Sequence, residues 1–476
     1  MTSDLRGLLQ QALDHALAYR EGVGEGLARP VESYHRQRER FMAPTPETGM
    51  DAALVLAELV AAAGPGLMPT IGPRFFAWVM GASHPAGVAA ELLVAAWGQN
   101  AGYQSTSPAA AAIEEAAEAW LLDMLDLPRE AGIGFSTGAT VANGICLAAA
   151  RTGTLRAVGW DADADGLFGA PPVHVLIGAD AHSSLYSSLQ LIGFGSKRVI
   201  AIATDTLGRM QPAALEQAIS GLEGPRIIIA QAGQINTGAY DPFEDIVAIG
   251  KAHDAWVHVD GAFGLWARAV PELKHLTAGI EGCDSWVTDG HKWLQVPYDS
   301  GFAIVRHREA LLGAMTQWSS YLPAVAQGDR VPANYVPELS RRARGVPVYA
   351  VLRTLGRQGV AELVEGHCAM AQQMAGLLAA EPGVTVVNPP IINQLIVDFG
   401  IGDAAARKAA TEAVIAEVQA DGVCYVAGAA WRGAWVMRIS ISSGATTAAD
   451  IERSAVAIIA AWRRVRGADI DQPPSP

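Results

Sequence analysis

Seven short apolar runs, each separated from the next by a helical segment, constrain the fold of this chain most strongly. Several are rich in Val and Ile and are bounded by Gly, Asp or Pro. Short runs that are apolar on both faces and alternate with helices are typical of a mostly parallel sheet covered by helices. The sequence therefore predicts an α/β fold with a seven-stranded sheet, its strands near 133–135, 174–177, 198–201, 226–230, 256–259, 285–287 and 302–305.

The pattern changes along the chain and predicts three parts. Residues 1–80 are expected to form an N-terminal helical segment with Pro and Gly breaks, and residues 81–350 a large domain. Residues 351–476 are expected to form a small C-terminal α+β domain. Within the large domain, residues 313–345 are polar and weakly periodic. A stretch of this length predicts a mobile lid or binding loop.

Charge and composition exclude several classes of protein. Asp and Glu number 48 against 34 Lys and Arg, which gives a net charge of -14. A nucleic acid or an anionic membrane surface is therefore a poor partner. The N-terminus lacks the basic start and the apolar stretch of a signal peptide, and the four cysteines have no zinc-like spacing. We expect a cytoplasmic protein with free thiols, no bound metal and no membrane contact.

Lys292 stands in the most informative segment of the chain. It follows a buried strand, beside His291 and between apolar residues. Desolvation there would lower the pKa of the amine, and a neutral amine can attack an aldehyde to form a Schiff base. The alternative is a surface lysine after a strand, which is the commoner outcome for a lysine considered alone.

Two further strand ends carry residues suited to an aromatic cofactor. Asp260 ends the strand 256–259, at the edge where parallel sheets bind ligands, and a carboxylate there can hold a proton on a pyridine nitrogen. Ala262 is small enough to let a flat ring lie against the chain. His182, which follows the strand 174–177, could stack on such a ring. A helix-capping aspartate and a simple hydrogen-bonded histidine are the alternatives.

The segment 135–143 predicts an anion site. It runs from a strand through small hydroxylated residues into a helix, and the free N–H groups at that helix start, with the Thr140 hydroxyl, suit a phosphate. There is no G-x-G-x-x-G motif and no Walker lysine, so a nucleotide is not the favoured ligand. Ordinary capping by Ser or Thr is the alternative.

Together, in the order anion site, histidine, aspartate and lysine, these segments resemble the group II amino acid decarboxylases that depend on pyridoxal 5'-phosphate (PLP). This family includes the aromatic amino acid decarboxylases. The resemblance spans about residues 75 to 442 and rests on H-V-D-x-A and H-K-W, with E-L-S-R-R at 338–342 and L-R-T-L-G at 352–356. It implies a fold-type I architecture, PLP as cofactor, and a homodimer with active sites at the subunit interface.

The resemblance also implies roles for single residues. Lys292 would carry the Schiff base, and Asp260 would pair with the ring nitrogen. Ala262 and His182 would lie on opposite faces of the ring. The remaining cofactor contacts would come from Ala139, Thr140, Asp289 and His291.

Within this resemblance, the segment 233–241 and Asp289 bear on how the cofactor would be held. Many relatives have a Thr-rich stretch before G-x-F-D, where this chain has G-Q-I-N-T-G-A-Y-D at 233–241. Asn236 or Thr237 would replace the hydroxyl that contacts the cofactor or the substrate carboxylate, and the sequence does not choose between them. An ionised Asp289 would repel a phosphate, so we expect Asp289 to accept from backbone or lysine donors.

The resemblance favours decarboxylation as the reaction. Tyr321 lies in the expected loop, at the position of a family tyrosine whose phenol protonates the carbon left by CO₂ loss. Relatives with Phe there tend toward oxidative aldehyde formation. The expected catalytic residues are Lys292, Asp260, His182, Tyr321 and His291.

The substrate is expected to be a small-molecule L-amino acid. Trp78, Val79 and Tyr103 occupy stretches that contact the substrate side chain in relatives, and they favour an aromatic or other apolar side chain, with core packing as the alternative. Other PLP reactions on the same fold are the alternative activity: transamination, retro-aldol cleavage or oxidative deamination to an aldehyde. A non-enzymatic α/β binding or assembly protein is the third hypothesis.

Overall fold

The computed structural model describes residues 4–316 and 329–470, with side chains described as far as residue 467. It divides into two compact units. The larger unit contains Gly81–Ala371 and Asn388–Leu395. The smaller unit contains Met1–Met80, Gln372–Val387 and Ile396–Pro476.

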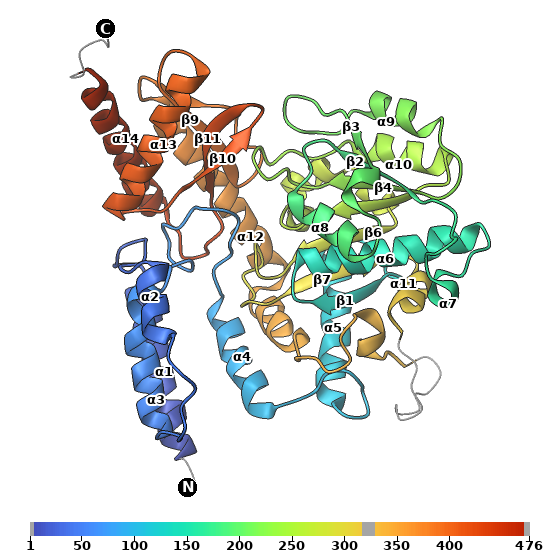
Figure 1. Cartoon of the computed structure of the whole chain (residues 1–476), viewed down its shortest axis with the longest axis horizontal. Helices are drawn as coiled ribbons and strands as arrows, with labels where there is room; N and C mark the ends of the chain where they lie inside the picture. The colour runs from blue at the N-terminus through green and yellow to red at the C-terminus, as the bar shows by residue number, and fades with distance from the viewer. Residues whose placement is uncertain (1–3, 317–328, 471–476) are drawn as a thin grey trace. The chain divides into compact units, whose positions relative to one another are not determined.

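The larger unit is built on a seven-stranded sheet with the strand order β1-β7-β6-β5-β4-β2-β3 (Figure 1). Strands β2 to β6 pair in parallel, and β7 runs antiparallel to both of its neighbours, β1 and β6. The predicted α/β class with a mostly parallel sheet is therefore confirmed. The strands are β1 (Gly132–Ser136), β2 (His174–Gly178), β3 (Val199–Ile202), β4 (Arg226–Gln231), β5 (Trp256–Asp260), β6 (Ser285–Asp289) and β7 (Gly301–Val305).

Helices connect these strands and cover the sheet (Figure 1). The α-helices are α4 (Pro85–Trp97), α5 (Pro108–Met124), α6 (Ala139–Ala157), α7 (Ala162–Asp165), α8 (Ser183–Leu191), α9 (Pro212–Ile219), α10 (Phe243–Ala252), α11 (Arg308–Met315) and α12 (Gly345–Ala379), whose last residues belong to the smaller unit. Short 3₁₀ helices are η2 (Ser196–Arg198), η3 (Gly264–Ala269), η4 (Pro271–Thr277), η5 (Ile280–Gly282) and η6 (Pro332–Tyr335).

The core of the larger unit lies where α6 packs across the sheet. Ala, Gly and Thr make up much of this helix, and such small side chains allow it to lie close to the strands. Ile145 and Leu147 of α6 lie in one buried cluster with Ile227, Ile229 and Val287 from the strands. This packing fixes the start of α6 at the edge of the sheet where β1, β5 and β6 end.

The smaller unit contains helices and a four-stranded sheet with the order β10-β11-β9-β8. Both β8–β9 and β10–β11 pair antiparallel. Its elements are α1 (Leu5–Gly22), α2 (Tyr34–Phe41), α3 (Ala52–Ala63), η1 (Gly64–Gly66), β8 (Val384–Val386), β9 (Gln394–Phe399), α13 (Ala404–Asp421), β10 (Ala427–Trp431), β11 (Ala434–Ser440) and α14 (Ala448–Ile470). Strand β9 begins with two residues of the larger unit.

The four cysteines are free, which confirms the expectation of unpaired thiols. Cys146, Cys283 and Cys424 are buried, and Cys368 is partly buried. In the part of the chain that the structure describes, no three His, Cys, Asp or Glu side chains gather as a metal site would need. No helix within residues 4–316 and 329–470 has the length and apolar character needed to span a bilayer.

Candidate active site

The predicted site residues of the larger unit gather at one edge of its sheet. Asp260 ends β5 and Asp289 ends β6, and these strands are parallel, so both carboxylates stand at the same edge. Gly301 of β7 pairs with Asp289 on one side and with Ser136 of β1 on the other. The turn from Ser136 into α6 therefore lies beside the end of β6.

Lys292 forms an ion pair with Asp289 at this edge of the sheet. Its Nζ lies 3.0 Å from Asp289 Oδ2, and His291 Nε2 lies 3.6 Å from the same oxygen. The other carboxylate oxygen of Asp289 is buried and has no hydrogen-bond partner among the described residues. A buried acceptor without a partner costs free energy, and a ligand that brings a donor relieves that cost.

Asp260 is a buried carboxylate placed to bind a cation. Its Oδ1 accepts the N–H of Ala262 at 3.1 Å. Burial raises the pKa of Asp260, while the charges of Lys292 and His182 lower it. A protonated pyridine nitrogen beside this carboxylate would favour its ionised form in the same way.

The start of α6 provides N–H groups for an anion. No side chain caps this helix end. A Cβ added at Gly138 would lie 3.0 Å from His291 Cε1 and 3.6 Å from Asp289 Oδ1, so the helix start is next to the lysine segment. Ala139 is buried, whereas Thr140 is exposed and open to a ligand. This is an arrangement suited to a phosphate.

His182 and Ala262 belong to the loops after β2 and β5. His182 is exposed and caps α8, where its Nδ1 accepts the N–H of Ser184 at 3.3 Å and lies 2.7 Å from the Ser184 hydroxyl. Ala262 is half-buried against the core, and its carbonyl accepts the N–H of Asp289 at 2.9 Å. The charge of His182 lowers the pKa of Asp260.

Asn236 and Thr237, the two candidates in the segment 233–241, are both buried. The buried Thr237 hydroxyl donates to the Leu207 carbonyl at 2.7 Å and accepts the Ala239 N–H at 3.3 Å. The hydroxyl thus joins its own turn to the loop that contains Leu207. The backbone N–H of Asn236 donates to Gln234 Oε1 at 2.6 Å. Both Asn236 and Thr237 thus remain candidates for a contact with cofactor or substrate.

The remaining predicted residues lie in different parts of the chain. Trp78 and Val79 belong to the smaller unit, where Val79 is buried and Trp78 is 45% exposed beside Phe75 and Tyr425. Trp78 has φ 55°, a conformation that non-glycine residues seldom adopt outside special sites. Tyr103 is buried in the larger unit. Tyr321 lies outside the described residues.

Three residues that contact the His291–Lys292 segment lie outside the sequence motifs: Tyr298, Ser300 and Gly81. The Tyr298 ring centroid lies 4.4 Å from that of His291, and the Ser300 N–H donates to His291 Nδ1 at 3.2 Å. That bond leaves the imidazole proton on Nε2, and burial lowers the pKa of His291, which keeps the ring neutral. A Cβ at Gly81 would overlap the Lys292 carbonyl, so only glycine fits there.

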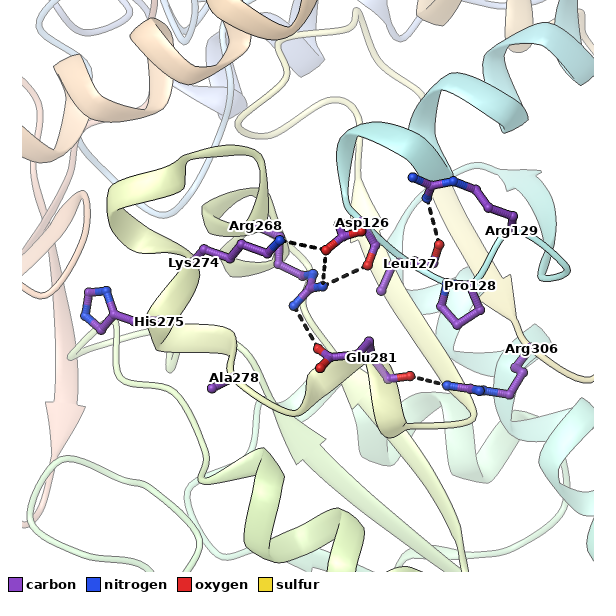
Figure 2. Close-up of a pocket in the computed structure, with 10 residues that line it drawn as sticks. All are labelled: Asp126, Leu127, Pro128, Arg129, Arg268, Lys274, His275, Ala278, Glu281 and Arg306. Atoms are coloured by element: carbon purple, nitrogen blue, oxygen red, sulfur yellow. Dashed lines mark hydrogen bonds and ion pairs between the residues drawn. The ribbon is translucent and has the colours of Figure 1, made fainter.

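A separate cavity of about 780 Å³ in the larger unit contains none of these residues. Four of its charged side chains pair with one another: Figure 2 shows Lys274 and Arg268 both reaching Asp126, and Arg268 also reaching Glu281. Arg268 further donates to the Leu125 carbonyl at 2.7 Å. These contacts tie the connection between α5 and β1 to η3 and η4, and η3 to η5, and we interpret the cavity as part of that structural junction.

The site residues fit PLP: an uncapped helix start for the phosphate, a lysine for the aldehyde and a buried carboxylate for the ring nitrogen. The family model described as "Pyridoxal-dependent decarboxylase conserved domain" matches residues 41–397, and the chain belongs to this family. It is a PLP-dependent amino acid decarboxylase. The expected family, cofactor and enzyme class are confirmed.

Named relatives agree with this assignment. Tryptophan decarboxylase 1 of Oryza sativa subsp. japonica is 28% identical, over 92% of this chain and 90% of the relative. L-2,4-Diaminobutyrate decarboxylase of Rhizobium meliloti (strain 1021) is 30% identical, over 74% of this chain and 70% of the relative. The crystal structure of Oryza sativa TDC with PLP and tryptamine matches with a TM-score of 0.91 at 25% identity and covers 98% of each chain, in agreement with the fold-type I architecture.

Proposed function

We propose that this enzyme removes the α-carboxylate of an L-amino acid with an aromatic or other large apolar side chain, releasing CO₂ and the amine. One observation carries the location of the reaction. Lys292 Nζ lies 3.0 Å from the buried Asp289 carboxylate, at the sheet edge that also holds Asp260 and the start of α6. An amine, an uncapped helix start and a buried carboxylate are the three contacts that PLP needs.

Bound there, PLP would supply an electron sink for the electron pair of the breaking Cα–carboxylate bond. Lys292 Nζ would hold the aldehyde carbon, and the Asp260 carboxylate would hold the proton on the ring nitrogen. The backbone N–H groups of Ala139 and Thr140 would bind the phosphate. His182 and Ala262 would flank the ring, and Asn236 or Thr237 would contact the substrate carboxylate or the cofactor.

Two further residues, Tyr321 and His291, transfer or hold a proton in this proposal. We assign the protonation of the substrate Cα, after CO₂ has left, to the phenol of Tyr321. His291 presents its Nε2–H to Asp289 and remains uncharged, because Nδ1 is occupied by the Ser300 N–H. His291 thereby adds a hydrogen-bond donor near the phosphate without adding a charge that changes with pH.

Trp78, Val79 and Tyr103 support the choice of an apolar substrate. We propose that these side chains select the substrate, and the left-handed φ of Trp78 favours a functional role for that residue. The similarity to a tryptophan decarboxylase points to an aromatic amino acid. Because another relative is an L-2,4-diaminobutyrate decarboxylase, a cationic amino acid belongs in the test.

A substrate panel tests the proposal. Enzyme loaded with PLP is given L-tryptophan, L-tyrosine, L-phenylalanine, L-leucine, L-2,4-diaminobutyrate and L-glutamate in turn, and CO₂ and amine are quantified. We expect equal amounts of both products and the highest kcat/KM with an aromatic substrate. Lys292→Ala should release neither, and borohydride should fix a pyridoxyl group on the Lys292 peptide of the unsubstituted enzyme only.

Two results would redirect the assignment. A higher kcat/KM for L-2,4-diaminobutyrate than for every aromatic substrate contradicts the apolar side-chain preference. An aldehyde with ammonia and hydrogen peroxide, in place of the amine, assigns the oxidative reaction instead. Tyr321→Phe tests the role of the phenol in decarboxylation. Its loss should lower amine formation while PLP still binds.

We also propose that the enzyme acts as a homodimer. Leu5, Leu9, Leu13 and Leu17 repeat every fourth residue along α1, and each is more than two-fifths exposed. Leu54 and Leu59 of α3 add exposed apolar surface on a helix that contacts α1. Exposed apolar surface of this kind is typical of a protein interface. A second copy of the chain is the occupant that the family resemblance favours.

A further inference from the structure

Four buried polar side chains form a continuous line of hydrogen bonds inside the larger unit. Trp256 Nε1 donates to Ser285 Oγ at 2.8 Å. Ser285 Oγ lies 2.9 Å from His258 Nδ1, and His258 Nε2 lies 2.8 Å from Asn143 Oδ1. Trp256 is 7% exposed and the other three are fully buried. The proposed function uses none of them.

The donors and acceptors along this line have a definite order. An indole N–H can only donate, so the Ser285 oxygen accepts from Trp256. The Asn143 Oδ1 can only accept, so the neutral His258 donates its Nε2–H to Asn143, and its Nδ1 accepts the proton of the Ser285 hydroxyl. Burial lowers the pKa of His258 to about 3, so the imidazole is a neutral link and adds no charge to the site.

The line joins the two elements that hold opposite ends of the cofactor. His258 and Asp260 are two residues apart on β5, so their side chains leave the strand on the same face. Asn143 lies about one turn beyond Ala139 at the start of α6. The line therefore connects the strand that carries Asp260 to the first turns of the helix that begins at the phosphate site.

Stability alone is a poor reason for this polar line. The Nδ2 of Asn143 is buried without a hydrogen-bond partner among the described residues, which costs free energy. An apolar set of similar shape would avoid that cost, as partly satisfied buried networks are less favourable than apolar cores. What hydrogen bonds add is a fixed spacing between the helix and the strand.

We propose that Asn143, His258 and Ser285 are positioning residues that set the distance between the start of α6 and Asp260. The inference rests on the cofactor position proposed above. PLP would be held at both ends, by the start of α6 and by Asp260, so its affinity depends on the distance between them. Inorganic phosphate would be held only at the start of α6, so its affinity does not depend on that distance.

The test compares these two ligands on variants of the full chain. His258→Phe keeps a ring but removes both nitrogens, and Ser285→Ala removes one hydroxyl. We expect the Kd for PLP, measured by fluorescence titration, to rise about 10- to 100-fold in each variant, with the Kd for phosphate within about twofold of the unsubstituted protein. The double variant should be no worse than His258→Phe alone, because the residues act as one unit.

Thr154→Val is the matched control. Thr154 is also a buried polar residue of α6, but its hydroxyl donates to the Ala150 carbonyl of its own helix at 2.8 Å. Its loss should leave both Kd values unchanged. If Ser285→Ala binds PLP as tightly as this control, or loses phosphate affinity in equal measure, the line has no positioning role and the proposal is overturned. Failure of the unsubstituted protein to take up PLP at Lys292 is a different result, and it overturns the proposed function as well.

Discussion

At the scale of single residues, His258 makes the stability of this protein depend on pH in a definite direction. In the folded chain burial lowers the pKa of His258 from 6.5 to about 3. As the pH falls below 6.5, the unfolded chain binds a proton at this residue and the folded chain does not. The stability that is present above pH 6.5 is therefore lost toward low pH.

The variant His258→Gln removes this titration. From His258 alone, the free energy of unfolding should fall by up to about 1.4 kcal/mol per pH unit below 6.5. We expect the slope of unfolding free energy against pH, from urea titrations between pH 4.5 and about 6.5, to be smaller in His258→Gln by up to this amount. His15→Gln, at an exposed residue of α1, serves as the control. An unchanged slope in His258→Gln would mean that water reaches the imidazole.

The residues differ in how well sequence reasoning could place them. Asp260, Asp289 and Lys292 follow apolar strands, and parallel strands end at one edge, so their gathering there could be predicted. The pairing of Asn143 with His258 could not, because the partners are 115 residues apart and no spacing in the sequence relates them. Only the three-dimensional packing of α6 on β5 brings the two together.

At the scale of elements, close packing of backbones decides which glycines can be replaced. A Cβ at Gly301 of β7 would overlap the backbone of Gly138, in the turn that leads into α6. A Cβ at Gly144, within α6, would come no closer than 3.8 Å to Leu191 Cδ2, which is ordinary van der Waals contact. The two positions should therefore respond to alanine in opposite ways.

Gly301→Ala should lower the unfolding free energy by about 1–3 kcal/mol, because the turn before α6 must shift. It should also weaken PLP binding, since that turn leads to the proposed phosphate site. Gly144→Ala should raise the unfolding free energy by about 0.5–1 kcal/mol by restricting the unfolded chain. Urea titration and PLP fluorescence titration measure both effects. Equal destabilisation by the two substitutions would refute the packing argument.

Elements also show where sequence patterns fail. All seven predicted strands of the large sheet are present, because each is an apolar run long enough to identify. In the small sheet, apolar runs of the sequence at 385–387, 394–398 and 436–441 predict three strands, which correspond to β8, β9 and β11. No such run predicts strand β10. Its sequence, A-G-A-A-W, has little strand propensity, and its pairing with β11 determines its conformation.

At the scale of the whole molecule, the exposed leucines of α1 need an explanation that one copy of the chain does not supply. Leu9 is 47% exposed and Leu13 is 41% exposed. Burying large apolar side chains yields about 25 cal/mol per Å² of surface removed from water. The proposed homodimer would recover that free energy, and the composition of α1 gives a direct way to test it.

The double variant Leu9→Glu/Leu13→Glu places two charges on this face. We expect the unsubstituted enzyme to have the mass of a dimer by light scattering, and the double variant to be a monomer with little amine formation, because burying unpaired carboxylates in an interface is costly. Ile401→Glu is the matched control: Ile401 is 85% exposed in the same unit but lies outside α1. It should remain dimeric and active. An active monomeric form of the unsubstituted enzyme would exclude α1 as an obligatory interface, whereas loss of the dimer in Ile401→Glu as well would show that added charge alone breaks the association.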